Sequence, residues 1–109
     1  MSFIKVAKDF CTAPGGRRRA YGNRSAEEFL ETLLLPRYIE SVTAGVPLGI
    51  DLDGVEGYAA SFLDEAFAGL ARARAPENIL DHLKLISFEE PYLIKEIEKY
   101  IKEATNART

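Results

Sequence analysis

The sequence predicts an α/β domain with a small mixed or parallel sheet and helices mainly on one face of that sheet. The first observation comes from residues 46–53, where Val46, Leu48, Ile50 and Leu52 alternate with residues suited to the opposite face. This period of two is typical of a strand that is buried on one face. The second observation is that strand-like and helix-like segments follow one another along the chain, as the crossover connections of parallel strands require.

Length and composition favour one domain that spans residues 1–109. A chain of 109 residues can bury roughly 65% of its unfolded surface in one core. Cys11 is the single cysteine, and no apolar stretch resembles a membrane span or a secretion signal, which predicts a cytoplasmic protein without a membrane partner. The net charge of -3 does not favour nucleic acid as a partner, because phosphate contacts need a basic excess.

The first strand is predicted within residues 3–10, with Ile4, Val6 and Phe10 on one face and the central strand as its neighbour. Residues 11–24 contain proline, three glycines and asparagine, and are predicted to form the longest irregular loop. Long ordered loops in compact domains often carry function.

A capping box opens the next helix, because Ser25 is followed three residues later by Glu28, which can reach back to the Ser25 amide. This helix is predicted to run at least to Leu35. Pro36 then kinks it or opens a second helical segment, which Gly45 ends.

The central strand leads through Gly54 and Gly57 into a helix for which Ser61 is the predicted N-cap, with Asp64 three positions on. The buried face of this helix is predicted from apolar residues at three-and-four spacing, namely Phe62, Leu63, Ala66, Phe67, Leu70 and Ala71.

The C-terminal part is predicted to contain a short helical turn at residues 77–82, a third strand at 83–88 and a final helix that begins near Pro91. The inward stripe of that helix comprises Leu93, Ile94, Ile97, Tyr100 and Ile101, and residues 106–109 are predicted to be a frayed tail.

Two stretches resemble the central motif of STAS domains, the fold of the anti-anti-sigma factors: residues 52–55 (Leu-Asp-Gly-Val) and residues 58–63 (Tyr-Ala-Ala-Ser-Phe-Leu). The family motif Asp-Ser-Ser-Gly-Leu-Gly places Ser61 on the phosphoacceptor serine and Leu63 on the leucine. Ala59, Ala60, Phe62 and Asp64 depart from that motif.

The chain more closely resembles the STAS-like domain family of unknown function found in bacteria and phages. The resemblance includes Phe10, Gly22, residues 14–17 (Pro-Gly-Gly-Arg), 25–29 (Ser-Ala-Glu-Glu-Phe), 52–55 and 61–67 (Ser-Phe-Leu-Asp-Glu-Ala-Phe). It implies a single compact STAS-like domain without an established activity.

The resemblance makes Ser61 the candidate phosphoacceptor of a non-catalytic regulatory module that switches between protein partners. It implies a partner such as a histidine-kinase-like ATPase or an anti-sigma-like factor, bound through Tyr58, Phe62, Asp64 and Glu65. A phosphate at a helix N-terminus is tolerated because it meets unpaired amides and the helix dipole. The alternative is that Ser61 only caps the helix.

The loop is the second candidate site, as a phosphate- or nucleotide-binding loop. Glycines let backbone amides approach a phosphate, and arginines bind its oxygens bidentately. The residues concerned are Gly15, Gly16, Arg17, Arg18, Arg19 and Arg24. The alternative is a solvated loop without a ligand, and a position near Ser61 is expected because both segments follow strands.

The remaining reactive side chains are predicted to have structural roles. Asp51 and Asp53 are two carboxylates without further ligands and are interpreted as loop-capping groups. His82 is the single histidine and Cys11 has no nearby base, so neither supports a catalytic centre. No metal or cofactor is predicted.

Overall fold

Three parallel strands form the sheet in the order β1-β2-β3. The structure, a computed structural model, describes residues 2–106 and contains β1 (Ser2–Lys5), β2 (Leu48–Asp51) and β3 (Leu83–Ile86). In the register, Ile50 lies opposite Ile4 on one side and Leu85 on the other. The arrangement confirms the predicted α/β fold and the pairing of the first strand with the central one, although β2 is shorter than residues 46–53.

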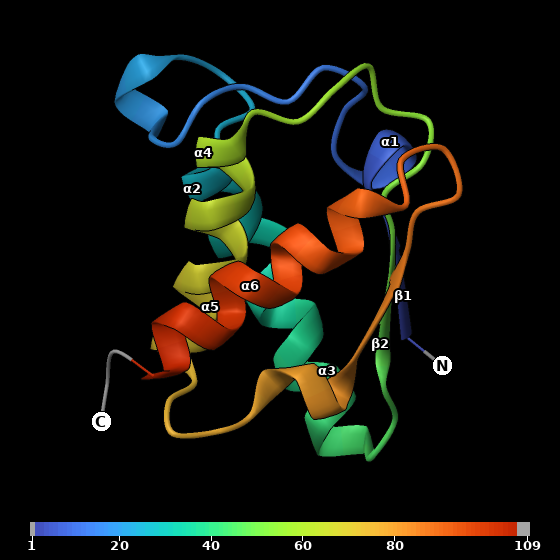
Figure 1. Cartoon of the computed structure of the whole chain (residues 1–109), viewed down its shortest axis with the longest axis vertical. Coiled ribbons are helices and arrows are strands. Elements are labelled where there is room, and N and C mark those ends of the chain that lie inside the picture. Colours follow the sequence, from blue (N-terminus) through green and yellow to red (C-terminus); the bar gives the residue numbers. More distant parts are fainter. Residues whose placement is uncertain (1, 107–109) are drawn as a thin grey trace.

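The helices cover one face of the sheet, as predicted (Figure 1). Crossovers between parallel strands share one handedness, so two steps in the same direction across a sheet pass over the same face. Ile4, Leu48 and Ile50 project toward the helices and are fully buried. On the opposite face, Phe3 is 43% exposed and its ring lies over Gly49.

The first crossover is a continuous helical segment made of α2 (Ala26–Phe29), the π-helical turn η2 (Leu30–Leu34) and α3 (Leu35–Ala44). The π-helical turn ends two residues before Pro36, and the helix continues past the proline. Gly45 ends it in the left-handed conformation with φ of 72°, which glycine adopts without strain.

Only half of the predicted capping box forms at Ser25. The Ser25 hydroxyl accepts a hydrogen bond from the Glu28 amide at 3.1 Å. The Glu28 carboxylate does not return to the Ser25 amide but accepts from the Arg24 amide at 3.0 Å. The reciprocal bond is therefore displaced by one residue into the loop.

The second crossover consists of α4 (Ala60–Leu63), the π-helical turn η3 (Asp64–Ala68) and α5 (Gly69–Ala73). All six residues of its predicted apolar face are buried. The prediction that Ser61 is the N-cap is wrong: Ala59 occupies that position without a side-chain bond, and Ser61 is the second residue of α4. An acidic residue three positions after a serine does not by itself fix where the helix begins.

The first strand is shorter than predicted, because α1 (Val6–Asp9) replaces its second half. The Asp9 carboxylate accepts a hydrogen bond from the Lys5 amide at 2.8 Å and thereby satisfies a free donor at the helix start. Ile4 and Val6 are buried as predicted. The alternation of apolar residues continues past the point where the strand ends.

The C-terminal elements are the short helical turn η4 (Ile79–His82), β3 and α6 (Tyr92–Asn106). In the predicted stripe of α6, Leu93, Ile97 and Ile101 are buried, whereas Ile94 and Tyr100 are half-buried. The third strand ends at Ile86 rather than residue 88. Asn106 closes α6, and residues 107–109 of the predicted tail lie outside the described part of the chain.

A buried tyrosine ties α3 to the segment after α5. The Tyr38 hydroxyl donates a hydrogen bond to one Glu77 oxygen, and Arg74 Nη2 donates to the other at 2.9 Å. The Arg74 guanidinium also lies 5.7 Å from the centroid of the Tyr38 ring. The hydrogen bond from Tyr38 is the main cause that holds the pKa of Glu77 below its ordinary value of 4.5, with Arg74 adding to it.

We expect Glu77→Gln to make the free energy of unfolding depend less on pH in the acidic range. A carboxylate whose folded pKa is lowered contributes stability that is present above its unfolded pKa and is lost as the pH falls through the folded pKa. The difference in free energy of unfolding between wild type and Glu77→Gln should therefore be largest near pH ~7 and shrink toward pH ~3 in urea denaturation. Glu40→Gln, at an exposed position on α3, is the control and should follow the wild type. Parallel pH profiles for wild type and Glu77→Gln would contradict the assignment.

Candidate functional site

The loops that follow the three strands meet at the carboxyl edge of the sheet (Figure 1). The Glu56 amide donates to the Thr12 carbonyl at 2.8 Å, which joins the loop after β2 to the loop after α1. The Gly54 amide donates to Glu89 Oε1 at 2.6 Å, which joins the loop after β2 to the loop after β3. The edge is therefore one connected surface.

Asp53 fixes the loop after β3. Its carboxylate accepts from the amides of Phe88 at 3.1 Å and Glu89 at 2.9 Å. Asp51 accepts from the Asp53 amide at 3.0 Å and pairs with Lys5 at 3.0 Å. These contacts agree with the loop-capping interpretation, and residues 2–106 contain no group of three or more side chains that could hold a metal ion.

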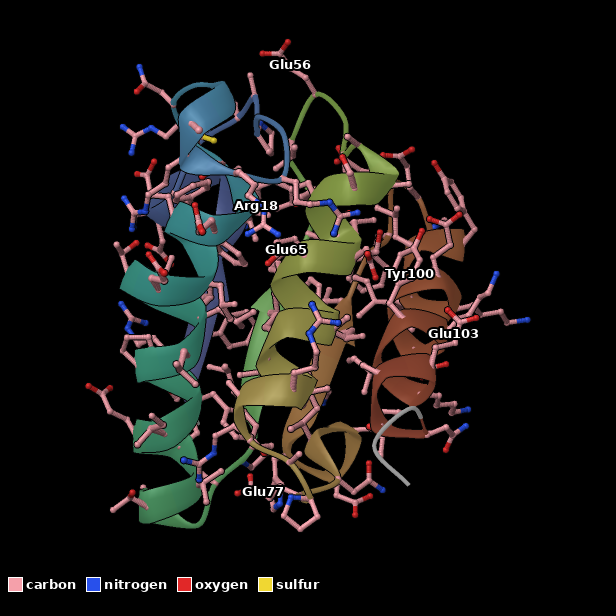
Figure 2. All side chains as sticks on the ribbon, turned by 90° about the vertical axis from the view of Figure 1, so that its left-hand side faces the viewer. Arg18, Glu56, Glu65, Glu77, Tyr100 and Glu103 are labelled. Atoms are coloured by element: carbon pink, nitrogen blue, oxygen red, sulfur yellow. The ribbon has the colours of Figure 1, made fainter. Side chains whose placement is uncertain are left out.

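Ser61 lies in an open depression at the start of the second crossover, the continuous helical segment α4–η3–α5 that is called the central helix below. Ser61 is half-buried as a residue, and its hydroxyl has no hydrogen-bond partner among residues 2–106. Figure 2 shows Tyr100 and Glu103 on α6, next to the helix that carries Glu65. The depression is lined by Arg17, Ala60, Ser61, Asp64, Tyr100 and Glu103.

Arg17 connects the loop to the central helix. Its Nη1 donates to Asp64 Oδ2 at 3.0 Å and to Glu65 Oε1 at 3.1 Å. Both carboxylates lie one helical turn beyond Ser61. The expected proximity of the loop to Ser61 is thus confirmed through one arginine.

The other three arginines of the loop do not lie at the Ser61 depression. They pair instead with carboxylates of the helix that follows the loop: Arg18 with Glu27 at 3.7 Å, Arg19 with Glu31 at 2.8 Å and Arg24 with Glu28 at 3.4 Å. The expected position of the loop near Ser61 therefore holds for Arg17 and is wrong for the other three arginines. Their partners are acidic residues of the first helical turns, which the arginines reach because the loop folds back over α2.

The comparison with protein families identifies the architecture. A family model described as "STAS-like domain of unknown function (DUF4325)" matches residues 25–93. The chain belongs to this STAS-like family. No match was found among curated proteins or solved structures.

The matched part of the STAS-like domain runs from the N-cap of α2 to the first turn of α6 and contains Ser61. Arg17, Tyr100 and Glu103 lie outside the match. Within residues 2–106, no helix combines the length and apolar character needed to cross a membrane.

Phe62 cannot serve the partner-binding role expected for it, because it is 1% exposed. Its ring packs in the core of the STAS-like domain, 5.7 Å from the Phe29 ring and 6.3 Å from the Phe10 ring. Tyr58 is half-buried and its hydroxyl donates to the Leu52 carbonyl at 3.0 Å. Burial, with a smaller effect of Asp51, raises the pKa of Tyr58.

Asp64 lines the depression and is bound to Arg17. Glu65 is also bound to Arg17, but its side chain is only 15% exposed and does not line the depression. Tyr100 and Glu103 complete its wall and were missed as site residues in the sequence. The apolar stripe of α6 placed Tyr100 facing inward, and no local pattern links either residue to a helix that begins about 40 positions earlier.

The glycines hold the loop in its closed shape. The Gly15 amide donates to the Arg24 carbonyl at 2.8 Å, so this amide is engaged within the chain. The carbonyls of Gly16 and Arg17 accept from the amides of Ala26 and Glu27 at 2.8 and 3.0 Å. The loop thereby satisfies donors that the first turn of α2 would otherwise leave unpaired.

We expect Gly15→Ala to destabilise the domain and Gly16→Ala to leave it nearly unchanged. A Cβ at Gly15 would stand 2.6 Å from the Asn23 carbonyl oxygen, whereas a Cβ at Gly16 meets nothing within 4 Å. Forcing the backbone apart should lower the free energy of unfolding by ~1–3 kcal/mol, and Gly16→Ala should stay within ~0.5 kcal/mol of wild type. Urea denaturation measures both, and equal effects of the two substitutions would refute the closed loop.

Proposed function

We propose that this STAS-like domain is a non-catalytic regulatory module that binds a protein partner at the Ser61 depression and releases it when Ser61 is phosphorylated. One observation carries the proposal: within the described residues 2–106 the Ser61 hydroxyl makes no hydrogen bond, and it lies at the start of the central helix, in an open depression beside Arg17.

The backbone at this helix start suits a phosphate. The amides of Phe62 and Leu63 donate to the Ala59 carbonyl at 3.0 and 3.2 Å, so the intrahelical bonds begin after Ser61. The amides of Ala60 and Ser61 precede these bonds and lie at the positive end of the helix dipole. A phosphate on Ser61 is therefore compatible with a folded helix.

The charges around Ser61 act in both directions. Asp64 and Glu65 repel an added phosphate, which carries up to two negative charges. Arg17 opposes this repulsion with its positive charge. Both of its ion pairs use Nη1, so the N–H groups of Nε and Nη2 are not used by these carboxylates. A guanidinium can bind a phosphate and a carboxylate at the same time because its N–H groups form a planar fork.

Phosphorylation would act on docking rather than on folding. A partner that covers the depression must remove water from Ser61, Asp64 and Glu103, and the added charge makes that desolvation more costly. A partner of the class of histidine-kinase-like ATPases or anti-sigma-like factors is consistent with the family resemblance. The second candidate, phosphate or nucleotide binding by the loop, is not favoured by any contact, because all four arginines have carboxylate partners.

The test combines phosphosite mapping with partner capture in the native cell. A tagged full-length chain is isolated after growth under several conditions. The tryptic peptide of residues 38–72 is then fragmented, since it contains five hydroxyl residues, Tyr38, Ser41, Thr43, Tyr58 and Ser61. We expect phosphate on Ser61. Ser61→Asp should lower recovery of the co-isolated partner by about tenfold, which corresponds to ~1.4 kcal/mol of binding free energy.

Thr43→Asp is the matched control, because Thr43 is exposed near the C-terminus of α3. It adds the same charge to the same tryptic peptide and should recover the partner as wild type does. Absence of phosphate on Ser61 in every condition, together with equal partner recovery by Ser61→Asp and wild type, would reject the proposed function.

A further inference from the structure

The segment of residues 87–92 holds an exposed aromatic ring on a rigid backbone. Phe88 is 83% exposed and Tyr92 is 56% exposed. A single exposed apolar residue needs no explanation. Here, however, Asp53 binds the amides of Phe88 and Glu89, and the Ser87 hydroxyl donates to the Glu90 carbonyl at 2.7 Å.

The carboxylates of Glu89 and Glu90 form no ion pair among residues 2–106. Glu89 accepts from the Gly54 amide, and Glu90 accepts from the Tyr92 hydroxyl at 2.7 Å. The hydrogen bond to Glu90 raises the pKa of Tyr92, with burial and then the charges of Glu90 and Glu96 adding to it. Lys5, on β1, is paired with Asp51 at 3.0 Å, and the charge of Glu89 makes only the smallest contribution to its raised pKa. Lys95 forms no ion pair with these groups.

At two other places in the chain, an aromatic ring and a carboxylate share one arginine. The Arg24 guanidinium lies 5.7 Å from the Phe10 ring centroid and pairs with Glu28. The Arg74 guanidinium lies 5.7 Å from the Tyr38 ring centroid and pairs with Glu77. In both cases a planar cation covers an aromatic face while a carboxylate binds its N–H groups, an arrangement that arginine makes better than lysine.

We propose that residues 88–92 are a docking point for an arginine-bearing segment of a partner protein. The segment offers the same ring and carboxylates as the two internal examples but lacks the arginine. Its backbone is already fixed, so little conformational entropy is lost when the ring is covered. The surface is formed by the loop after β3 and the first turn of α6, and it is independent of phosphorylation at Ser61.

The direct test is an NMR titration of the ¹⁵N-labelled full-length chain with the peptide acetyl-Gly-Arg-Leu-Arg-Leu-Gly-amide. We expect saturable shifts of the amide signals of residues 88–92, with a Kd on the order of 1 mM for so short a probe. The same peptide with lysine in place of arginine should bind at least about threefold more weakly. An ammonium group is not planar and cannot stack flat on a ring as a guanidinium does.

Two variants and one control locate the contact. Phe88→Ala should weaken peptide binding about fivefold, since it removes the anchor ring, and Glu90→Gln should weaken it because it removes a charge. Ile39→Ala is the control, because Ile39 is 40% exposed on α3, away from the segment, and it should bind as wild type does. Each spectrum reports folding through the remaining amides.

Three outcomes would overturn the proposal: shifts that map to other residues, equal binding by Phe88→Ala and wild type, or no shift at about 10 mM peptide. None of them depends on the state of Ser61.

Discussion

The parallel pairing of β2 with both β1 and β3 determines where the other parts of the domain lie. Neighbouring parallel strands must be joined by crossovers, and both crossovers here cover the same face. All three strands then end at one edge, and three irregular segments must share that edge. The proximity of Arg17 to Ser61 and of Asp53 to Phe88 follows from this topology.

Carboxylates hold the irregular segments together. Side chains of this kind accept hydrogen bonds from the amides of Lys5, Arg19, Arg24, Gly54, Phe88 and Glu89. Loop amides that lack a ladder or helix partner need an acceptor, and a charged acceptor forms a stronger bond than a neutral one. Part of the acidic excess of the sequence is therefore used inside the fold, so net charge alone does not describe the free surface.

Periodicity predicted which side chains are buried better than it predicted where elements end. The apolar face of the central helix is buried in full, and Leu93, Ile97 and Ile101 of the α6 stripe are buried as well, because burial depends on spacing within each segment. The end of β1 was predicted wrongly because the alternation of buried residues continues past it. Ile4 is buried in the strand, and Val6 is buried in the helix that follows. The N-cap at Ser61 was missed because Ala59, which has no capping side chain, occupies that position.

The contacts of the loop arginines could not be predicted, because Arg17 pairs with carboxylates 47 and 48 positions away. In the sequence, four arginines form one basic cluster. In the fold, three of them pair with carboxylates of the first crossover helix, and Arg17 alone of the four lines the Ser61 depression.

This division limits how a phosphate on Ser61 could be stabilised. One guanidinium faces the carboxylates of Asp64, Glu65 and the nearby Glu103, so the side chains around the depression carry a negative charge in sum. A phosphate there depends on the amides at the helix start and on the N–H groups of Arg17 that the carboxylates do not use. Such a site is weaker than an arginine cluster. For a switch this is an advantage, because a phosphate that is not sequestered by its own domain stays exposed to the partner surface that it must repel.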